Sequence, residues 1–281
     1  MGYKTVLVHA DLSRHAPERI ALAAAICAEH AAHLVGAAMT GIAPSVFPRG
    51  AQQAPASLLA GLADPLAAAA RKALCRFEEI ARRHGVSHES RLVCDQAPDG
   101  LALLARFADL VVVGQDDPDD SLGYTSPAAR MPDHVVANAA RPVLVVPRAP
   151  AAPLSCPRRV LLCWNGSREA SRAMDAAVPL MRRASRTALA LFASAFPDGG
   201  ANEQDLADAQ AFLRRRGVRA DLALRDPLHD TGRAILALAA QRDCDLVVMG
   251  CYGHTRFQEL LLGGASRTVL REASLQVLMA R

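Results

Sequence analysis

The sequence contains an internal repeat, and this repeat constrains the fold more than any other feature. Asp245-Leu-Val-Val-Met-Gly250 matches Asp109-Leu-Val-Val-Val-Gly114 at five of six positions. The segments at 159–167 and 275–280 match those at 5–13 and 142–147 in the same order. Because order and spacing both persist, the sequence indicates a duplication. A chain of 281 residues is long enough for two domains of ordinary size.

Apolar runs and amphipathic stretches alternate in both halves. Strands are expected at residues 4–9, 33–39, 87–94, 109–114 and 141–147, and again at 159–165, 187–193, 218–224, 245–250 and 275–280. Helices are expected at 14–31, 64–84, 98–107, 132–139, 168–183, 204–216, 231–242 and 267–273. This alternation predicts an α/β fold of two tandem doubly wound domains. Each is expected to have a five-stranded, mainly parallel sheet flanked by helices.

A proline-rich segment separates the two halves. We expect domains at 1–149 and 158–281, joined by a semi-rigid linker at 150–157. The last strand of each domain lies at a sheet edge, and unpaired edges favour pairing with another strand. The strands at 142–147 and 275–280 can therefore pair within one chain as an intrachain pseudo-dimer. A further homodimer through edge strands is a second expectation.

The segment from Gly250 to Ser266 is the strongest candidate for a binding site. Gly250 and Gly253 follow a buried strand, and Gly263-Gly264 precede a helix after a nine-residue spacer. A helix N-terminus presents unpaired N–H groups and partial positive charge, and glycine lets backbone approach a phosphate closely. The pattern favours phosphate binding, although glycines at strand ends also serve simply to turn the chain.

The Gly-two-Gly-nine-Gly spacing resembles the ATP-binding signature of the universal stress protein family, and the resemblance covers both halves. It implies an adenine nucleotide alpha hydrolase-like fold and a stress-response role. It also implies binding of ATP or another adenine nucleotide, with or without a bound Mg ion. By this resemblance the nucleotide contacts are Asn165, Ala193, Met249, Gly250, Gly253, His254, Gly263, Gly264, Ala265 and Ser266. Two positions depart from the family pattern, which usually has serine or threonine at Gly264 and aspartate at Asn165.

Topology gives the same location for a ligand. Asn165, Asp226 and Gly250 each end a predicted strand. Ligands of open α/β sheets lie outside the carboxyl ends of the strands, where strand order reverses. Structural interpretations stay open, because Asn165 can simply start the turn into the next helix, and Ala193 and Met249 can be core residues.

The first half departs from the signature at the equivalent loop. Asp117 stands where the second glycine would be, within the acidic run 116–120, and Ala129-Arg130 align with Gly263-Gly264. Carboxylates close to a triphosphate repel it, so no nucleotide is expected here. The acidic run is interpreted as a solvated turn, with a site for a hard divalent cation as the alternative.

No catalytic motif is found in the sequence. The Gly-x-Ser-x-Gly, His-Glu-x-x-His and P-loop patterns are all absent, so we expect at most weak ATP hydrolysis. His229 and Asp230 suit either a base with its orienting group or a helix cap. Cys251 suits either a thiol sensor or a passive loop residue. The alternative function is a module that binds a protein or small ligand without nucleotide.

Composition excludes several classes of protein. A net charge of +4 and 4% aromatic residues argue against a nucleic-acid partner. Seven cysteines without a Cys-x-x-Cys pair favour a reducing compartment, and no apolar run reaches the length of a membrane span. We therefore expect a cytoplasmic protein with a partner protein still to be identified. The irregular stretch 41–63 is interpreted as a surface insertion, with a lid as the alternative.

Overall fold

The chain folds into two units, Gly2–Ala140 and Arg141–Arg281. The computed structural model describes residues 2–41, 56–119, 131–192, 203–225, 230–251 and 264–281. Within these ranges no helix is long and apolar enough to cross a bilayer. None of the seven cysteines, which all lie in these ranges, forms a disulfide bond.

The N-terminal unit is built on a parallel sheet of order β3-β2-β1-β4. Its elements, in chain order, are β1 Thr5–His9, α1 Ala16–His30, β2 His33–Met39, α2 Ala56–Arg83, β3 His88–Val93, α3 Ala97–Leu104, η3 Ala105–Phe107, β4 Leu110–Gly114 and α4 Met131–Asn138. Residues of β1 and β4 are almost entirely buried, as expected of parallel strands covered on both faces.

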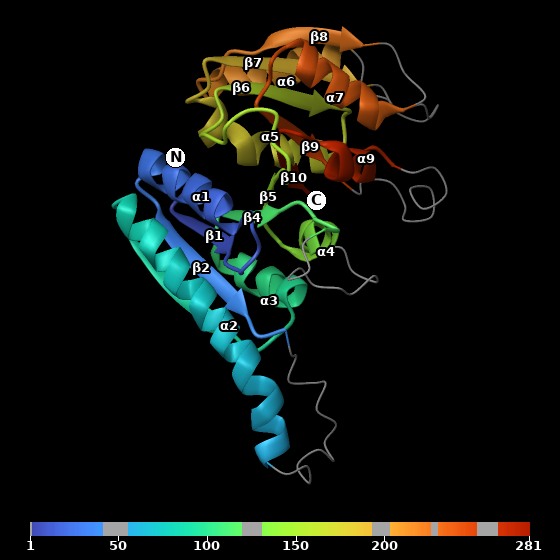
Figure 1. The fold of residues 1–281 in the computed structure, drawn as a ribbon. Helices are drawn as coiled ribbons and strands as arrows, with labels where there is room; N and C mark the ends of the chain where they lie inside the picture. The colour runs from blue at the N-terminus through green and yellow to red at the C-terminus, as the bar shows by residue number, and fades with distance from the viewer. Residues whose placement is uncertain (1, 42–55, 120–130, 193–202, 226–229, 252–263) are drawn as a thin grey trace. The chain divides into compact units, whose positions relative to one another are not determined.

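Strand order reverses between β1 and β4, because the chain first winds outward to β2 and β3 and then crosses back. Right-handed crossovers in opposite directions place helices on opposite faces of a sheet. In agreement, α1 packs with α2, and α3 packs with α4 (Figure 1). The carboxyl ends of β1 and β4 lie where the strand order reverses, and we call this place the N-terminal switch point.

The C-terminal unit repeats this plan and adds two strands. Its elements are β5 Val143–Val146, β6 Arg159–Trp164, α5 Arg168–Met181, β7 Arg186–Phe192, α6 Glu203–Arg215, β8 Asp221–Arg225, α7 Thr231–Gln241, β9 Leu246–Gly250, α9 Ala265–Glu272 and β10 Gln276–Ala280. The strand order is β5-β10-β9-β6-β7-β8. All pairs are parallel except β5 with β10, and the order reverses between β6 and β9, which defines the C-terminal switch point.

The antiparallel pairing of β5 with β10 confirms that the last strands of the two repeats pair within one chain. Leu144 lies opposite Leu278, and β10 also pairs with β9 on its other side. The strand that ends the first repeat is thus part of the unit that contains the second. Because β10 has a partner on both sides, its edge is not free for another chain. A homodimer through other edge strands stays a prediction.

Several element boundaries differ from those expected. Helix α2 begins at Ala56 rather than at residue 64, so it includes part of the stretch expected to be irregular, and it continues through Pro65. Residues 42–55, the rest of that stretch, lie outside the described residues. Strand β8 begins at Asp221 rather than at residue 218. Helix α1 begins at Ala16 rather than at residue 14, and this shift matters for the N-terminal switch point.

Close packing of α2 on the sheet depends on a glycine in β2. A Cβ atom on Gly36 would lie 2.5 Å from ring atoms of Phe77, whose side chain in α2 is fully buried. The Phe77 ring thus lies directly on the backbone of β2, in space that any other residue at position 36 would fill.

We predict that Gly36→Ala lowers the free energy of unfolding of the N-terminal unit by about 1–3 kcal/mol, the usual cost of overpacking. Urea denaturation checks this value. In a Phe77→Leu background, which makes room beside the strand, the same substitution should cost clearly less. Equal costs in both backgrounds would show that the ring does not limit position 36.

Candidate functional site

Asn165 and Gly250 lie on the two sides of the C-terminal switch point. Asn165 follows β6 and Gly250 ends β9. The two strands are parallel neighbours, with Leu162 opposite Val248, so they reach their carboxyl ends together. The structure thus brings these two predicted site residues to one edge of the sheet.

The side chain of Asn165 organises the turn into α5. Its Oδ1 accepts hydrogen bonds from Ser167 N at 3.2 Å and Ser167 Oγ at 2.7 Å. Ser167 Oγ in turn accepts from Ala170 N at 3.1 Å and caps the helix. The side-chain oxygen therefore has a structural role, while the amide donors of Asn165 have no acceptor among the described residues.

Gly250 permits a very close approach of α5 to β9. A Cβ atom at this position would lie 2.3 Å from Ala170 N and 2.5 Å from Glu169 C. Both are backbone atoms of the first helical turn and cannot move aside independently. This glycine is therefore required for helix packing, whatever ligand lies beyond it.

Two neighbours of Gly250 are buried in the core. Met249 is 5% exposed and lies opposite Met279. Cys251 is 2% exposed, and its Sγ donates to Ala280 O at 3.2 Å. Since a reactive thiol needs solvent access, the structure supports the passive interpretation of Cys251.

The N-terminus of α9, the next described element after β9, is a second part of the candidate site. Gly264 is its N-cap, and Gly264 O accepts from Arg267 N at 2.9 Å. Within the described residues the backbone N–H groups of Ala265 and Ser266 have no acceptor. Such orphan donors make the start of a helix a favourable place for an anion.

The position of α9 is fixed by close contact with α7. A Cβ atom on Gly232 would lie 2.6 Å from Thr268 Cβ and 3.0 Å from Ala265 O. Helix α7 itself begins at Thr231, with Asp230 Oδ1 accepting from Arg233 N at 3.0 Å. This confirms the capping interpretation of Asp230. Its sequence neighbour His229 lies outside the described residues, as do the predicted contacts Ala193, Gly253, His254 and Gly263.

The N-terminal switch point contains a buried ionic group that we call the Asp11 cluster, formed by His9, Asp11 and Arg19. Arg19 Nη2 lies 2.9 Å from Asp11 Oδ1, and Arg19 Nε donates to His9 O at 3.1 Å. His9 Nδ1 lies 3.2 Å from Asp11 Oδ2. The Arg19 guanidinium covers the end of β4, 2.6 Å from where a Cβ of Gly114 would stand.

Burial and charge fix the ionisation of the Asp11 cluster. Burial lowers the pKa of His9 to about 4, an effect that outweighs the opposing charge of Asp11. For Asp11 burial alone would raise the pKa, but the charge of Arg19, with His9 and the Ser13 hydroxyl, holds it well below its usual range. At neutral pH the cluster is therefore a neutral imidazole beside a carboxylate–guanidinium pair.

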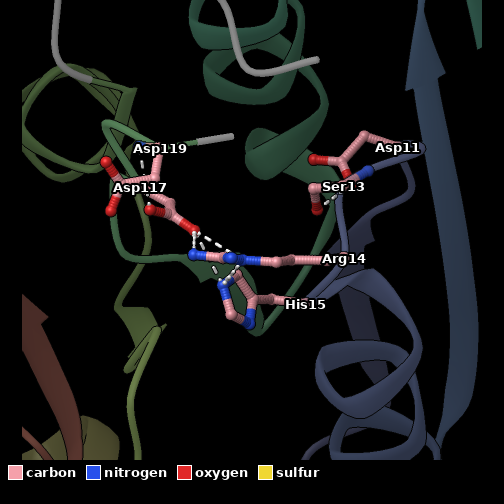
Figure 2. Close-up of polar contacts among 6 residues, drawn as sticks. All are labelled: Asp11, Ser13, Arg14, His15, Asp117 and Asp119. Atoms are coloured by element: carbon pink, nitrogen blue, oxygen red, sulfur yellow. Dashed lines mark hydrogen bonds and ion pairs between the residues drawn. The ribbon is translucent and has the colours of Figure 1, made fainter. Parts of the chain in front are cut away.

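A second ionic group, the Asp117 cluster, is formed by Arg14, His15 and Asp117 (Figure 2). Asp117 Oδ2 accepts from Arg14 Nε at 2.9 Å and from Arg14 Nη2, and it lies 2.9 Å from His15 Nε2. These contacts join the segment after β1 to the segment after β4. They therefore cross the N-terminal switch point.

The acidic run of the first repeat is thus not the solvated turn expected from the sequence, at least at Asp117. Its side chain is only 6% exposed. Burial would raise its pKa, but hydrogen bonds from His15, the Asp119 N–H and Arg14 together lower it. Within the described residues no group of side chains is arranged to hold a metal ion. At Asp117 the segment after β4 is therefore held by contacts with Arg14 and His15.

Comparison with known proteins identifies the C-terminal half. The model of the universal stress protein family matches residues 157–281. This half of the chain belongs to the universal stress protein family. The matched domain begins just before β6 and contains the whole C-terminal switch point. No curated protein matches the chain by sequence.

Solved structures are similar over the full chain. A universal stress protein from Archaeoglobus fulgidus DSM 4304 has a TM-score of 0.71 at 14% identity, covering 99% of this chain and 96% of its own. A protein of unknown function from Pseudomonas aeruginosa PAO1 has 0.59 at 16% identity, covering 99% and 92%. A putative universal stress protein from Pseudomonas aeruginosa UCBPP-PA14 has 0.56 at 17%, covering 99% and 93%. These likenesses show a shared fold and confirm the tandem α/β arrangement.

Sequence reasoning missed the cations of the N-terminal switch point. No sequence pattern singled out Arg14, His15 or Arg19 as candidate site residues. A signal was present in the repeat alignment, because the pair Arg14-His15 stands where the universal stress protein domain has Arg168-Glu169. The exchange of a glutamate for a histidine accompanies the appearance of an aspartate at position 117.

The two strand-end glycines give a matched pair of substitutions. Gly250→Ala places a methyl group against backbone of α5, so we predict a loss of about 3 kcal/mol in the free energy of unfolding. Gly114→Ala meets only the end of the Arg19 side chain and should cost less. Thermal and urea denaturation of both variants check the order. Equal losses would contradict the assigned role of Gly250.

The Asp11 cluster predicts an acid sensitivity. Because the folded-state pKa of His9 lies below its unfolded value of about 6.5, the unfolded chain binds the extra proton as pH falls. Stability from this group should therefore decrease between pH 6.5 and 4.5, by about 2 kcal/mol. Asp11 acts only at lower pH, since its stabilising contribution is lost below its unfolded pKa of about 3.9.

Urea denaturation across this pH range, compared with His9→Gln, isolates the effect. The variant should lose most of the decrease that the wild-type protein shows. The same slope in both proteins would mean that His9 is not a buried neutral group.

Proposed function

We propose that the C-terminal universal stress protein domain binds one adenine nucleotide, ATP with or without Mg, and acts as a non-catalytic regulator in a stress response. The observation that carries this proposal is the start of α9, where the N–H groups of Ala265 and Ser266 have no acceptor among the described residues. Helix α9 follows β9, so its N-terminus lies on the carboxyl side of the sheet, where α/β proteins bind ligands.

The electrostatics of the domain agree with an anionic ligand. No ion pair among the described residues joins the ends of β6 and β9, in contrast to the Asp117 cluster of the first repeat. Arg267, in the first turn of α9, is exposed, and the helix dipole adds partial positive charge. A phosphate chain would thus meet donors and positive potential at this helix start.

A specific observation favours the second candidate, a binding module without nucleotide. Asn165 Oδ1 is already occupied by Ser167, so only the amide donors of Asn165 are available to an adenosine. In either case we place the protein in the cytoplasm, since the sequence has an odd number of cysteines and no Cys-x-x-Cys pair.

Titration of ATP, with and without Mg, tests the proposal. Trp164 is the only tryptophan of the chain and directly precedes Asn165, so its fluorescence is a local reporter. We expect about one mole of ATP per chain. Gly253→Asp should weaken binding at least 100-fold, because one more charge about 4 Å from a phosphate costs about 4 kcal/mol at an effective dielectric constant of 20.

The matched control is Ala207→Asp, which adds the same charge at an exposed position of α6 and should leave affinity unchanged. An unaltered affinity in Gly253→Asp would place the site elsewhere. Two moles of ATP per chain would contradict the inactive first repeat. No binding by the folded protein would favour the module without nucleotide.

A further inference from the structure

The two repeats differ in how the first helix begins after the first strand. In the C-terminal unit, Ser167 caps α5, and Arg168 and Glu169 belong to its first turn. In the N-terminal unit, Ser13 bonds to Asp11 as Ser167 bonds to Asn165, but Ala16 N donates to Ser13 O rather than to its hydroxyl, and the helix starts at Ala16. The helix is therefore shortened at its start by the two residues whose side chains form the Asp117 cluster.

Because α1 begins only at Ala16, Arg14 and His15 lie outside the helix, at the switch point. Outside the helix, both side chains reach the segment after β4 and meet Asp117 (Figure 2). The space over Gly114 is filled by Arg19, whereas the space over Gly250 is filled by backbone of α5. The altered helix start, the Arg19 contact and the Asp117 contact are thus parts of one arrangement.

The donors around Asp117 are those of an oxyanion site. Oδ2 accepts from the Arg14 guanidinium and lies beside His15 Nε2, while Oδ1 accepts from Asp119 N at 3.1 Å. Arg14 Nε also lies 3.0 Å from His15 Nε2. Arg14 Nε thus donates to both Asp117 Oδ2 and His15 Nε2, and His15 Nε2 donates to Asp117 only in the form of the ring that carries a hydrogen on that nitrogen. Guanidinium, imidazole and backbone N–H donors are the groups that proteins use to bind phosphate.

We propose that the N-terminal repeat contains an anion site that is occupied by its own Asp117. The carboxylate takes the place of a phosphate-class oxyanion between Arg14, His15 and the Asp119 N–H. Occupation by a residue of the chain keeps this repeat closed at any nucleotide concentration. Removing the carboxylate uncovers a site for inorganic phosphate.

The experiment follows binding at His15 itself, so that it does not depend on the C-terminal domain. The protein is labelled with ¹³C-histidine, and the His15 signal is assigned from a His15→Gln variant. Inorganic phosphate is then titrated into wild-type, Asp117→Ala and Asp119→Ala proteins. Asp119→Ala is the matched control, because it removes a nearby charge but leaves the Asp117 side chain and the backbone donor in place.

In Asp117→Ala the His15 signal should shift with phosphate in a saturable manner, at least tenfold more tightly than in wild-type protein. Asp119→Ala should behave like wild-type. Adding Arg14→Ala to Asp117→Ala should abolish the gain. Phosphate binding no tighter than wild-type in Asp117→Ala, or a gain that survives loss of Arg14, would overturn the proposal.

Two further measurements keep the result decisive. If Asp117→Ala does not fold, Asp117→Asn removes the charge at constant shape, and its His15 signal should respond to phosphate at higher concentration. No response in the folded Asn variant would also overturn the proposal. In the Asp117→Ala protein, ATP should bind near His15 no more tightly than phosphate does. The reason is that Asp11, which stands where Asn165 does in the second repeat, is already paired with Arg19 and is not available to an adenosine. Much tighter ATP binding would contradict a site limited to a small oxyanion.

Discussion

The group that packs over the glycine at the end of the fourth strand of each repeat determines how the surrounding residues are arranged. At Gly250 the first turn of α5 packs on the strand with no room for a side chain. At Gly114 the same space holds the Arg19 guanidinium, and α1 starts later. One backbone position thus supports two arrangements, and only the first leaves the switch point without ionic contacts among the described residues.

The ionic arrangement of the first repeat is costly to form and costly to disturb. Removing charges from water carries a penalty that close pairing must offset, and here several hydrogen bonds accompany each carboxylate. Asp11 has Arg19 and Ser13 as partners, and Asp117 has Arg14 and His15. Loss of Arg19 would leave the Asp11 carboxylate without its charged partner in a largely enclosed position, whereas Arg14, whose side chain is 61% exposed, would stay solvated without Asp117.

The sequence predicts the architecture well, because periodicity and duplication are properties of the whole chain. The alternating elements, the reversal of strand order and the pairing of the last strands are all confirmed. Boundaries at 14–16 and 56–64 were wrong, because ion pairing at Asp117 and continuation through Pro65 override local signals.

The candidate site is only partly predictable from the sequence. Asn165 and Gly250 lie at neighbouring strand ends and Gly264 precedes α9, but their contact with a nucleotide stays a prediction, and close helix packing explains Gly250 without any ligand. The contacts of Arg14 and His15 with Asp117 could not be predicted from the sequence, since these residues are separated by about a hundred positions.

The pairing of β5 with β10 has a consequence for how the chain can be divided. The strand that ends the first repeat is held by the last strand of the second, although the proline-rich linker lies between them in sequence. A protease cut within 150–157 would therefore leave the two fragments associated through this strand pair. A recombinant fragment that begins at the linker would instead expose the free edge of β10, and such an edge promotes self-association. Expression of the second repeat alone is therefore better begun before residue 143.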